Sequence, residues 1–359
     1  FYTKPPIFVR GSGVCLWGLE NSNVFKGIDY VCPKPGGGMY SLLRLLGDGR
    51  FHSGEELGRA LGVSRSAVWK YLQRLEDECG IELFKVPGKG YRLAAPLSLL
   101  SYEDNAAVLA PLGWQLYLRE STDSTNAEAL RLLHAGVAAP FVVLAEGQTH
   151  GRGRRGRVWT SPPAQNIYYT LVLKVSNGLQ GLSGLSLVVG LAVLRALHRA
   201  GIESAGLKWP NDVYAGGRKI AGILLELNGD PADLCHVIIG IGVNVNMAPS
   251  TQGIGQAWTS VREQTGMLAS RDDLARFVSE ALSHYVERHA REGFSSLRDE
   301  WEANNIWRGR RCTLSTGTQQ VKGMMNGIDE QGALRLWIEG QGERCFSGGE
   351  LSLRLDDDS

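Results

Sequence analysis

Residues 148–157 read Gln-Thr-His-Gly-Arg-Gly-Arg-Arg-Gly-Arg, and this stretch separates two kinds of fold. Gly151, Gly153 and Gly156 have the GxGxxG spacing of a dinucleotide-binding fingerprint. Such a fingerprint opens a helix, whereas here the chain continues into Val-Trp-Thr-Ser-Pro-Pro over residues 158–163. The stretch also lacks the Gly-Lys-Ser/Thr ending of a phosphate-binding P-loop. It therefore predicts a loop and argues against a dinucleotide-binding fold.

The arginines of this loop, Arg152, Arg154, Arg155 and Arg157, indicate a ligand. Glycines let a backbone approach a bound molecule closely, and guanidinium groups neutralise phosphate oxygens. The combination predicts a loop that orders over a nucleotide. A solvated basic turn, or a patch that contacts nucleic acid, would have the same composition, and the stretch alone does not choose between these explanations.

Around the loop, predicted strands and helices alternate. The predicted strands cover residues 141–145, 167–174, 220–227 and 237–246, with another near residue 207, and the predicted helix covers residues 185–200. This order predicts a mixed α/β or α+β core for residues 103–305.

A second polar cluster, Lys208-Trp-Pro-Asn211-Asp212, leaves the strand near residue 207 and is followed by Lys219. A carboxylate beside an amide can hold hydrated Mg²⁺ and a nucleotide, and two lysines can neutralise the charge that develops on a reacting phosphate. The alternative explanation is a polar turn between two strands.

A third cluster, Ser-Thr-Asp-Ser-Thr-Asn over residues 121–126, opens a predicted helix. It is either an ordinary helix N-cap or a set of hydrogen-bond donors for a neutral polar ligand.

Residues 39–102 have the pattern of a winged helix-turn-helix. Leucines at helical spacing lie in residues 39–46, a capping box occupies residues 53–56, and a tight turn at residues 62–64 leads into a third helix over residues 65–78. Residues 81–93 then predict a β-hairpin with a basic tip.

The third helix and the hairpin tip are the predicted DNA-reading surface. The side chains expected to face DNA are Arg65, Ser66, Lys70, Gln73, Arg74 and Lys89. Residues 39–102 hold nine Lys or Arg and seven Asp or Glu, so one copy attracts DNA weakly and we expect dimers to bind an operator. The alternative is a winged helix that contacts protein.

The C-terminal residues 306–359 predict a small β-barrel. Short alternating stretches at residues 311–314, 320–325, 334–338 and 351–355 are separated by Gly-rich turns. The predicted division of the chain is thus a leader (1–38), the head (39–102), the core (103–305) and this domain.

The bulk composition limits the class of protein. The chain has 359 residues, 43% hydrophobic and 21% charged, a net charge of +1, and no apolar run long enough to cross a bilayer. Its six cysteines form no CxxC pair, which favours a reduced, cytoplasmic protein without a zinc site. The leader has no helical or strand period and ends in Gly-Gly-Gly before Met39. We expect it to be unstructured or to be translated upstream sequence, with a genuine disordered tail as the alternative.

Together these motifs resemble the biotin protein ligase family, in the bifunctional form that doubles as a biotin operon repressor. The motifs that carry the resemblance are Ser124-Thr-Asn126, Gln148 with the loop at residues 151–157, Lys208-Trp-Pro-Asn-Asp212, Lys219-Ile-Ala-Gly222, Ile241-Gly-Val-Asn244 and Gly348-Gly-Glu-Leu-Ser352. The resemblance implies a multidomain α+β protein with a winged helix-turn-helix, a mixed α/β core of the biotin/lipoate ligase type and a C-terminal SH3-like β-barrel. The Gly-rich residues 249–256 match no motif of the family.

The resemblance also implies roles for individual residues. The residues implied to bind biotin are Ser124, Thr125, Asn126, Gln148, Gly151, Arg152 and Lys219. The residues implied to bind ATP or the adenylate are Arg154, Arg155, Arg157, Trp159, Asn211 and Asn244. Lys219, Arg154 and Lys208 would be catalytic, and Asp212 would help to bind Mg²⁺.

The implied activity has two steps. The biotin carboxylate attacks the α-phosphorus of ATP, which yields biotinyl-5'-AMP and pyrophosphate. A lysine of the biotin carboxyl carrier protein of acetyl-CoA carboxylase then attacks this mixed anhydride. Bound biotinyl-AMP would promote a homodimer that represses biotin synthesis genes at their operator. Two alternatives are a lipoate ligase and a repressor that senses biotin without catalysis.

Overall fold

The computed structural model describes residues 38–77, 79–175, 181–230, 235–248, 254–316, 319–347 and 351–356. The predicted leader lies outside these ranges except for Gly38, and so do residues 249–253 and the first three residues of the motif at 348–352. Among the described residues, no helix is long and apolar enough to cross a membrane.

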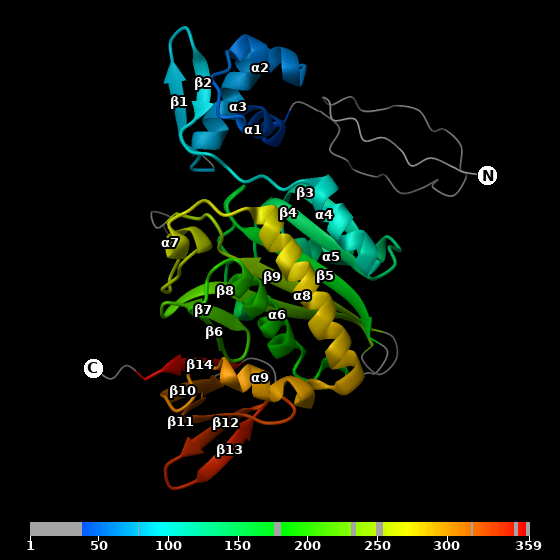
Figure 1. Ribbon diagram of the computed structural model, residues 1–359, viewed down its shortest axis with the longest axis vertical. Helices are drawn as coiled ribbons and strands as arrows, with labels where there is room; N and C mark the ends of the chain where they lie inside the picture. The colour runs from blue at the N-terminus through cyan, green and yellow to red at the C-terminus, as the bar shows by residue number, and fades with distance from the viewer. Residues whose placement is uncertain are drawn as a thin grey trace, which may run out of the picture. The chain divides into compact units, whose positions relative to one another are not determined.

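The head has the predicted order of elements (Figure 1). These are α1 (Met39–Leu46), α2 (Gly54–Leu61), α3 (Arg65–Asp77), β1 (Leu83–Val86) and β2 (Gly90–Leu93). Ser53 Oγ accepts a hydrogen bond from the backbone N–H of Glu56 at 3.1 Å, which caps α2 as predicted. Gly62 ends α2 with φ of +66°, a conformation that glycine adopts without a steric penalty. The predicted winged helix-turn-helix is confirmed.

The core is built on a sheet with the strand order β3-β4-β5-β9-β8-β7-β6. The strands are β3 (Gln115–Thr122), β4 (Phe141–Gln148), β5 (Ile167–Val175), β9 (Cys235–Val243), β8 (Arg218–Gly229), β7 (Asp212–Ala215) and β6 (Ala205–Lys208). β3 and β4 are parallel, and the other neighbours are antiparallel. The predicted strands are all present, with small shifts at their ends.

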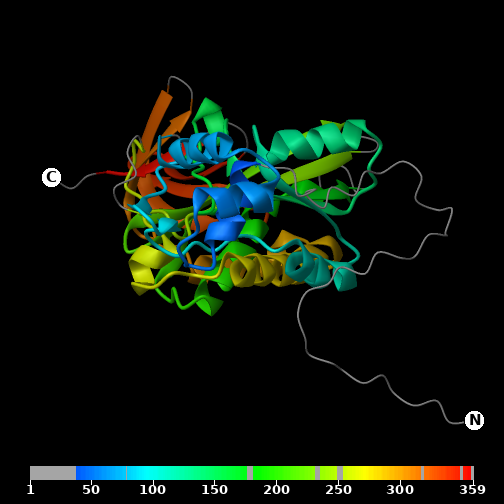
Figure 2. The ribbon, with the colours of Figure 1, turned by 90° about the horizontal axis from the view of Figure 1, so that it is seen from above.

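Helices cover both faces of this sheet, which explains the apolar strands. The helices that contact this sheet or pack on those that do are α4 (Tyr102–Leu109), α5 (Thr125–His134), α6 (Leu185–Arg199) and α8 (Arg271–Glu292). Two shorter helices, α7 (Val261–Thr265) and α9 (Arg298–Ala303), follow the sheet strands in the chain. Along β4, Val142 and Leu144 pack into the larger core with α6 and α8, whereas Phe141 and Val143 pack toward α5. Figures 1 and 2 show α5 on one side of the sheet and α4 beside α8 on the other.

The C-terminal strands form an antiparallel sheet with the order β13-β12-β11-β10-β14. They are β10 (Arg311–Thr316), β11 (Gln319–Ile328), β12 (Leu334–Ile338), β13 (Gly342–Phe346) and β14 (Leu351–Leu355). The small β-domain is thus confirmed as an antiparallel sheet, and β13 was not among the predicted strands. Trp209 Nε1 donates to the carbonyl of Gly332 at 3.0 Å, so the polar cluster at residues 208–212 contacts this domain. The predicted domain boundaries stay predictions.

Candidate active site

The turn between β3 and α5 brings buried polar residues to the end of β4. The parallel register sets Thr122 opposite Gln148. Gln148 Oε1 accepts hydrogen bonds from the backbone N–H of Thr125 at 2.8 Å and from Thr125 Oγ1 at 3.2 Å. Ser124 occupies the N-cap position of α5, but its side chain makes no capping hydrogen bond within the described part of the chain. An ordinary N-cap therefore does not explain this motif.

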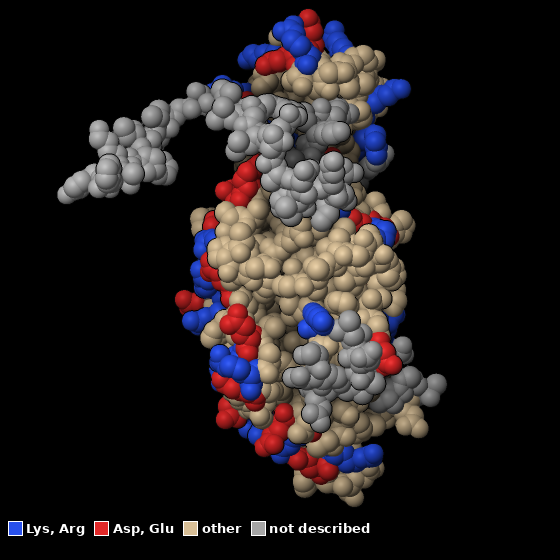
Figure 3. All heavy atoms as spheres, turned by 90° about the vertical axis from the view of Figure 1, so that its right-hand side faces the viewer, with Lys and Arg blue, Asp and Glu red and all other residues tan. Residues whose placement is uncertain are grey.

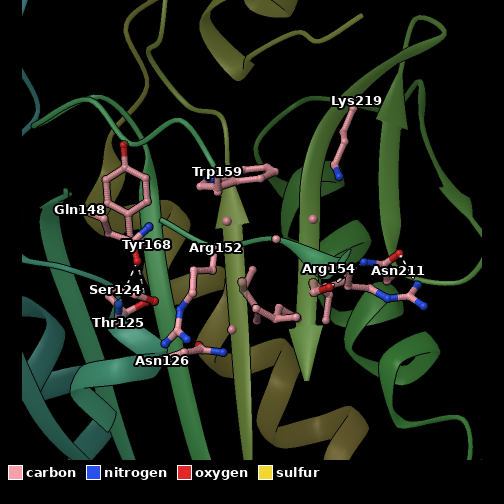
Figure 4. Close-up of a pocket in the computed structure, with 17 residues that line it drawn as sticks. Ser124, Thr125, Asn126, Gln148, Arg152, Arg154, Trp159, Tyr168, Asn211 and Lys219 are labelled. Atoms are coloured by element: carbon pink, nitrogen blue, oxygen red, sulfur yellow. Dashed lines mark hydrogen bonds between the residues drawn. The ribbon is translucent and has the colours of Figure 1, made fainter. Parts of the chain in front are cut away.

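A first cavity lies beside this turn (Figure 4). Of the predicted ligand-binding residues, those that line it are Ser124, Thr125, Asn126, Gln148, Arg152, Arg154, Trp159, Asn211 and Lys219. Tyr168 and strand residues of β8 and β9 complete the lining, among them Gly222, Leu224 and Gly240. The fold thus brings three separate sequence clusters around one cavity.

The arginine-rich loop closes on itself and does not open a helix. Gly153 N–H donates to the carbonyl of Arg157 at 2.8 Å, and Trp159 N–H donates to the carbonyl of Gly151 at 2.9 Å. A short 3-10 turn covers Arg154–Gly156. The prediction that the GxGxxG spacing here does not form a dinucleotide fingerprint is confirmed.

Two glycines of the sheet make room for Trp159. A Cβ atom at Gly242 would lie 2.4 Å from the Trp159 ring, and one at Gly222 would lie 3.1 Å from it. The indole therefore rests directly on the strands, with the ammonium of Lys219 5.3 Å from its ring centroid. Its buried Nε1–H has no hydrogen-bond partner among the described residues. Trp159 lines both this cavity and a second one.

A charged triad of Lys208, Asp212 and Lys219 lies in the second cavity. Lys208 ends β6 directly opposite Asp212 at the start of β7. Asp212 Oδ1 lies 2.6 Å from Lys219 Nζ, and Oδ2 lies 3.3 Å from Lys208 Nζ. Burial alone would raise the pKa of Asp212, but the two ammonium groups outweigh it and hold the pKa below its usual value.

Lys208 is enclosed by aromatic rings. Its Nζ lies 5.1 Å from the ring centroid of Tyr214 and 4.7 Å from that of Trp307. Burial lowers the pKa of Lys208, although Asp212 opposes this effect. The rings stabilise the cation and hold it at the edge of the second cavity.

The two cavities share one wall. The residues that line both are Gly153, Arg154, Trp159, Asn211 and Lys219. Arg154 Nη1 donates to Asn211 Oδ1 at 3.1 Å, so the loop is tied to the polar cluster at residues 208–212 (Figure 4). Arg155 and Arg157 line the second cavity only. The shared wall is where a group in one cavity would meet a group in the other.

Two predicted ligand-binding residues have structural contacts instead of a place in either cavity, within the described residues. Asn244 is buried, and its Nδ2 donates to the carbonyl of Thr259 at 3.0 Å. Gly151 begins the loop, at a point where a Cβ atom would be 2.4 Å from the Trp159 carbonyl oxygen. The roles given to both residues stay predictions.

Sequence reasoning missed several site residues. Tyr168, Tyr214, Glu226 and Trp307 lie in or beside the two cavities, yet none belongs to a sequence cluster. The sequence does not single out Tyr168, because Tyr169 and Thr170 follow it in the same predicted strand.

The predicted DNA-contacting side chains share one helix and one turn. Arg65, Ser66, Lys70, Gln73 and Arg74 belong to α3, and Lys89 lies in the turn between β1 and β2. All are exposed except Gln73, which is partly buried. Trp69, which sequence reasoning did not include, is 51% exposed on the same helix. Figure 3 shows Lys and Arg over the head with Asp and Glu among them, in agreement with its nearly balanced charge.

Three regions of the sequence match known families. Residues 118–244 match the Biotin/lipoate A/B protein ligase family. Residues 39–92 match an HTH domain, and residues 309–354 match the Biotin protein ligase C terminal domain. The regions follow the order that the motifs predicted.

Similar proteins cover most of the chain. The Bifunctional ligase/repressor BirA of Escherichia coli is 37% identical over 315 residues, which are 87% of this chain and 96% of the relative. The protein of the same name from Bacillus subtilis is 31% identical over 290 residues, 80% of this chain and 89% of the relative. A solved biotin protein ligase from Aquifex aeolicus, in complex with biotin and ATP, has a TM-score of 0.60 at 30% identity and covers 67% of this chain and 99% of its own.

Proposed function

The chain belongs to the biotin protein ligase family, in the form that joins a ligase to a helix-turn-helix repressor head, and from this premise we propose how its residues work. Biotin binds in the first cavity and ATP in the second. The ligase forms biotinyl-5'-AMP and then passes the biotinyl group to a lysine of a carrier protein. The helix-turn-helix head and the matched C-terminal domain favour a biotin ligase over a lipoate ligase.

The observation that carries this proposal is the wall common to both cavities. Lys219, Arg154 and Asn211 line each of them. A carboxylate that enters from the first cavity therefore meets the α-phosphate of a nucleotide in the second beside a lysine and an arginine. Positive groups fixed in advance stabilise the charge that develops in phosphoryl chemistry without reorganising during the reaction.

In the first step, side chains of the protein orient the two substrates and neutralise their negative charges. Lys219 leaves Asp212 and contacts the biotin carboxylate and the α-phosphate, while Lys208 stays near Asp212. Arg154 and Arg157 neutralise phosphate oxygens. The carboxylate oxygen bonds to the α-phosphorus as pyrophosphate leaves, so no side chain acts as a nucleophile.

In the second step, the arginine-rich loop and Trp159 protect the adenylate. An acyl adenylate is a reactive mixed anhydride, and a closed loop excludes water from it. The ε-amine of the carrier lysine attacks the acyl carbon, an amide forms, and AMP leaves. The carrier is the biotin carboxyl carrier protein of acetyl-CoA carboxylase.

Mg²⁺ enters as part of the MgATP substrate. Both oxygens of Asp212 face ammonium groups, and no group of three or more His, Cys, Asp or Glu among the described residues could hold a metal ion. The residues present therefore do not fit a metal site formed by the protein alone. Asp212 as a magnesium ligand stays a prediction.

The repressor function requires two copies of the helix-turn-helix head. The head's nearly balanced charge gives one copy weak attraction for DNA, so two copies that bind two half-sites are needed. Biotinyl-AMP would favour the homodimer, and an unmodified carrier would compete with the second subunit. Cys235, Cys312 and Cys345 are free thiols, which supports the proposal of a cytoplasmic location.

One assay separates the ligase from its alternatives. The purified protein is mixed with MgATP and either labelled biotin or labelled lipoate, with or without a carrier domain. We expect labelled adenylate without the carrier and labelled carrier when it is present. Adenylate formation from lipoate in preference to biotin would indicate a lipoate ligase, and biotin binding without adenylate would indicate a sensor.

Footprinting tests the repressor function. The probe is the promoter region of the protein's own biotin synthesis genes. We expect protection only when biotin and ATP are both present. Protection that is independent of both would contradict control by biotinyl-AMP.

A further inference from the structure

Glu226 of β8 is a carboxylate beside the first cavity that has no role in the reaction described above. Gly222 and Leu224 of β8 line the cavity, and Glu226 is the next residue on the same face because side chains alternate along a strand. Its side chain is 37% exposed.

Glu226 fixes the orientation of Asn126. Asn126 is 4% exposed, and its Nδ2 donates to Glu226 Oε2 at 2.7 Å. On the other side, Thr170 Oγ1 donates to Asn126 Oδ1 at 2.7 Å. A carboxylate only accepts hydrogen bonds, so the amide nitrogen must face Glu226 and the amide oxygen must face Thr170.

Gly240 has no side chain and so leaves room for the carboxamide of Asn126. A Cβ atom at Gly240 would lie 2.4 Å from Asn126 Oδ1. Gly240 lies opposite Thr170 of β5 in the sheet. The carboxamide therefore rests on bare backbone between two fixed partners.

Further polar contacts lead from Thr170 toward Gln148. Thr170 Oγ1 lies 2.9 Å from Thr125 Oγ1, which lies 3.2 Å from Gln148 Oε1. Because the single hydroxyl proton of Thr170 goes to Asn126, Thr170 can only accept from Thr125, and the one hydroxyl proton of Thr125 serves either Thr170 or Gln148 Oε1. The acceptor Glu226 thus sets the direction of the hydrogen bonds of Asn126 and Thr170.

Glu226 also faces the loop that covers the cavity. Arg152 Nη1 lies 4.0 Å from Glu226 Oε1. Figure 4 shows the side chain of Arg152 reaching from the loop toward Asn126. This pair is half-exposed, so its attraction is screened by water and the bond to Asn126 is the stronger contact.

We propose that Glu226 is a positioning residue that determines specificity in the biotin site. By fixing the donors and acceptors of Asn126 and Thr170, it gives this part of the wall one hydrogen-bond pattern, which a neutral ring system with matching polar groups can satisfy. Glu226 acts through these side chains and takes no part in the reaction itself. The inference rests on the proposed function of the first cavity.

The main test replaces Glu226 with Gln. Gln can present either oxygen or nitrogen to Asn126, so Asn126 can flip and the single pattern is lost. We expect E226Q to raise the KM and the Kd for biotin about tenfold, as for an unsatisfied buried polar group, with kcat and the KM for ATP unchanged. A structural defect would lower kcat and the active fraction instead.

Two substitutions of the buried Thr170 test the same chain of hydrogen bonds beyond Asn126. Thr170→Val keeps the shape of the side chain but removes the hydroxyl, and should raise the KM for biotin as E226Q does. Thr170→Ser keeps the hydroxyl and should have the KM for biotin of the unmodified protein. The double variant E226Q/T170V should have a KM for biotin no higher than that of the more impaired single variant, because both substitutions break the same chain of hydrogen bonds. The T170V and T170S pair also decides the question if E226Q does not fold.

A matched control is Glu280→Gln. Glu280 is a half-exposed glutamate of α8, and its Oε2 lies 2.6 Å from Arg199 Nη1. The substitution should leave the KM for biotin unchanged. An E226Q protein that binds biotin as tightly as the unmodified protein, or E226Q and T170V effects that multiply independently, would overturn the inference. Calorimetry of the unmodified protein separates the two levels: no biotin binding there contradicts the proposed function, whereas binding unaffected by E226Q contradicts only the role of Glu226.

Discussion

Glu146 and Arg271 form an ion pair in which the two side chains are only 1% and 0% exposed. Glu146 Oε1 also accepts from the backbone N–H of Leu100 at 2.7 Å, and Arg271 Nη1 donates to the carbonyl of Ser98 at 3.0 Å. Glu146 lies in β4 two residues before Gln148, and Arg271 begins α8. The pair therefore joins residues 98–100, at the end of the predicted head, to the strand that supports the first cavity.

Removing one partner of this pair should destabilise the protein strongly. A buried charge left without its partner costs about 3–5 kcal/mol, so Glu146→Gln and Arg271→Met should each lower the free energy of unfolding by about that amount. The double variant should recover part of the loss, because neither charge is then left alone. Urea unfolding measures all of these. Single variants within 1 kcal/mol of the unmodified protein would show that the pair contributes little.

Lys219→Ala should abolish adenylate formation. Lys219 is the ammonium group common to both cavities, and its loss leaves the reacting carboxylate and phosphate with the guanidinium of Arg154 alone. We expect biotin-dependent adenylate to fall at least about a hundredfold, the usual loss when one group that stabilises the transition state is removed. Labelled biotin with chromatography of the product measures this. Turnover equal to that of the unmodified protein would remove Lys219 from its assigned role.

Arg154→Gly should loosen the hold on the adenylate. The variant loses the contact between Arg154 and Asn211, which ties the loop over the shared wall. The adenylate should then dissociate about tenfold faster or more, as for the loss of a charge-assisted hydrogen bond, and should label unrelated lysines. Arg199→Ala removes an arginine outside both cavities and is the control. Strict selectivity for the carrier in Arg154→Gly would count against this role.

The parts of this protein that sequence predicted are those with local signals. The predicted helix at residues 185–200 is observed as Leu185–Arg199, because an apolar stretch of this length is typical of a buried helix and too long for most strands. The capping box of α2 and the loop at residues 151–157 are equally local. Each depends on neighbours within a few positions, and these can be read along the chain.

The parts that were missed depend on distant partners. Glu226 is one carboxylate in an apolar strand, and its partner Asn126 lies 100 residues away. Arg271 is a buried charge that pairs across 125 residues, and α8, which it begins, was not among the predicted helices. Spacing along the sequence contains no information on such pairs, because the packing of the sheet decides them.

The stability contributed by Asp212 should depend on pH in one direction. The two lysines hold the pKa of Asp212 below its usual 3.8, so the folded state keeps the carboxylate charged at lower pH than the unfolded chain does. The stability difference between the unmodified protein and Asp212→Asn should be constant above the usual pKa and shrink as the pH falls through the folded-state pKa. Urea unfolding at several pH values measures it. A difference that grows as the pH falls would mean that the lysines do not stabilise the charged form.

The most direct test of the shared wall is the exchange of labelled pyrophosphate into ATP, which reports reversible adenylate formation without any carrier. With purified protein and Mg²⁺, we predict rapid exchange that requires biotin and is lost in Lys219→Ala. Exchange that proceeds without biotin, or none when biotin is present, would contradict the account that the two cavities bring biotin and ATP together.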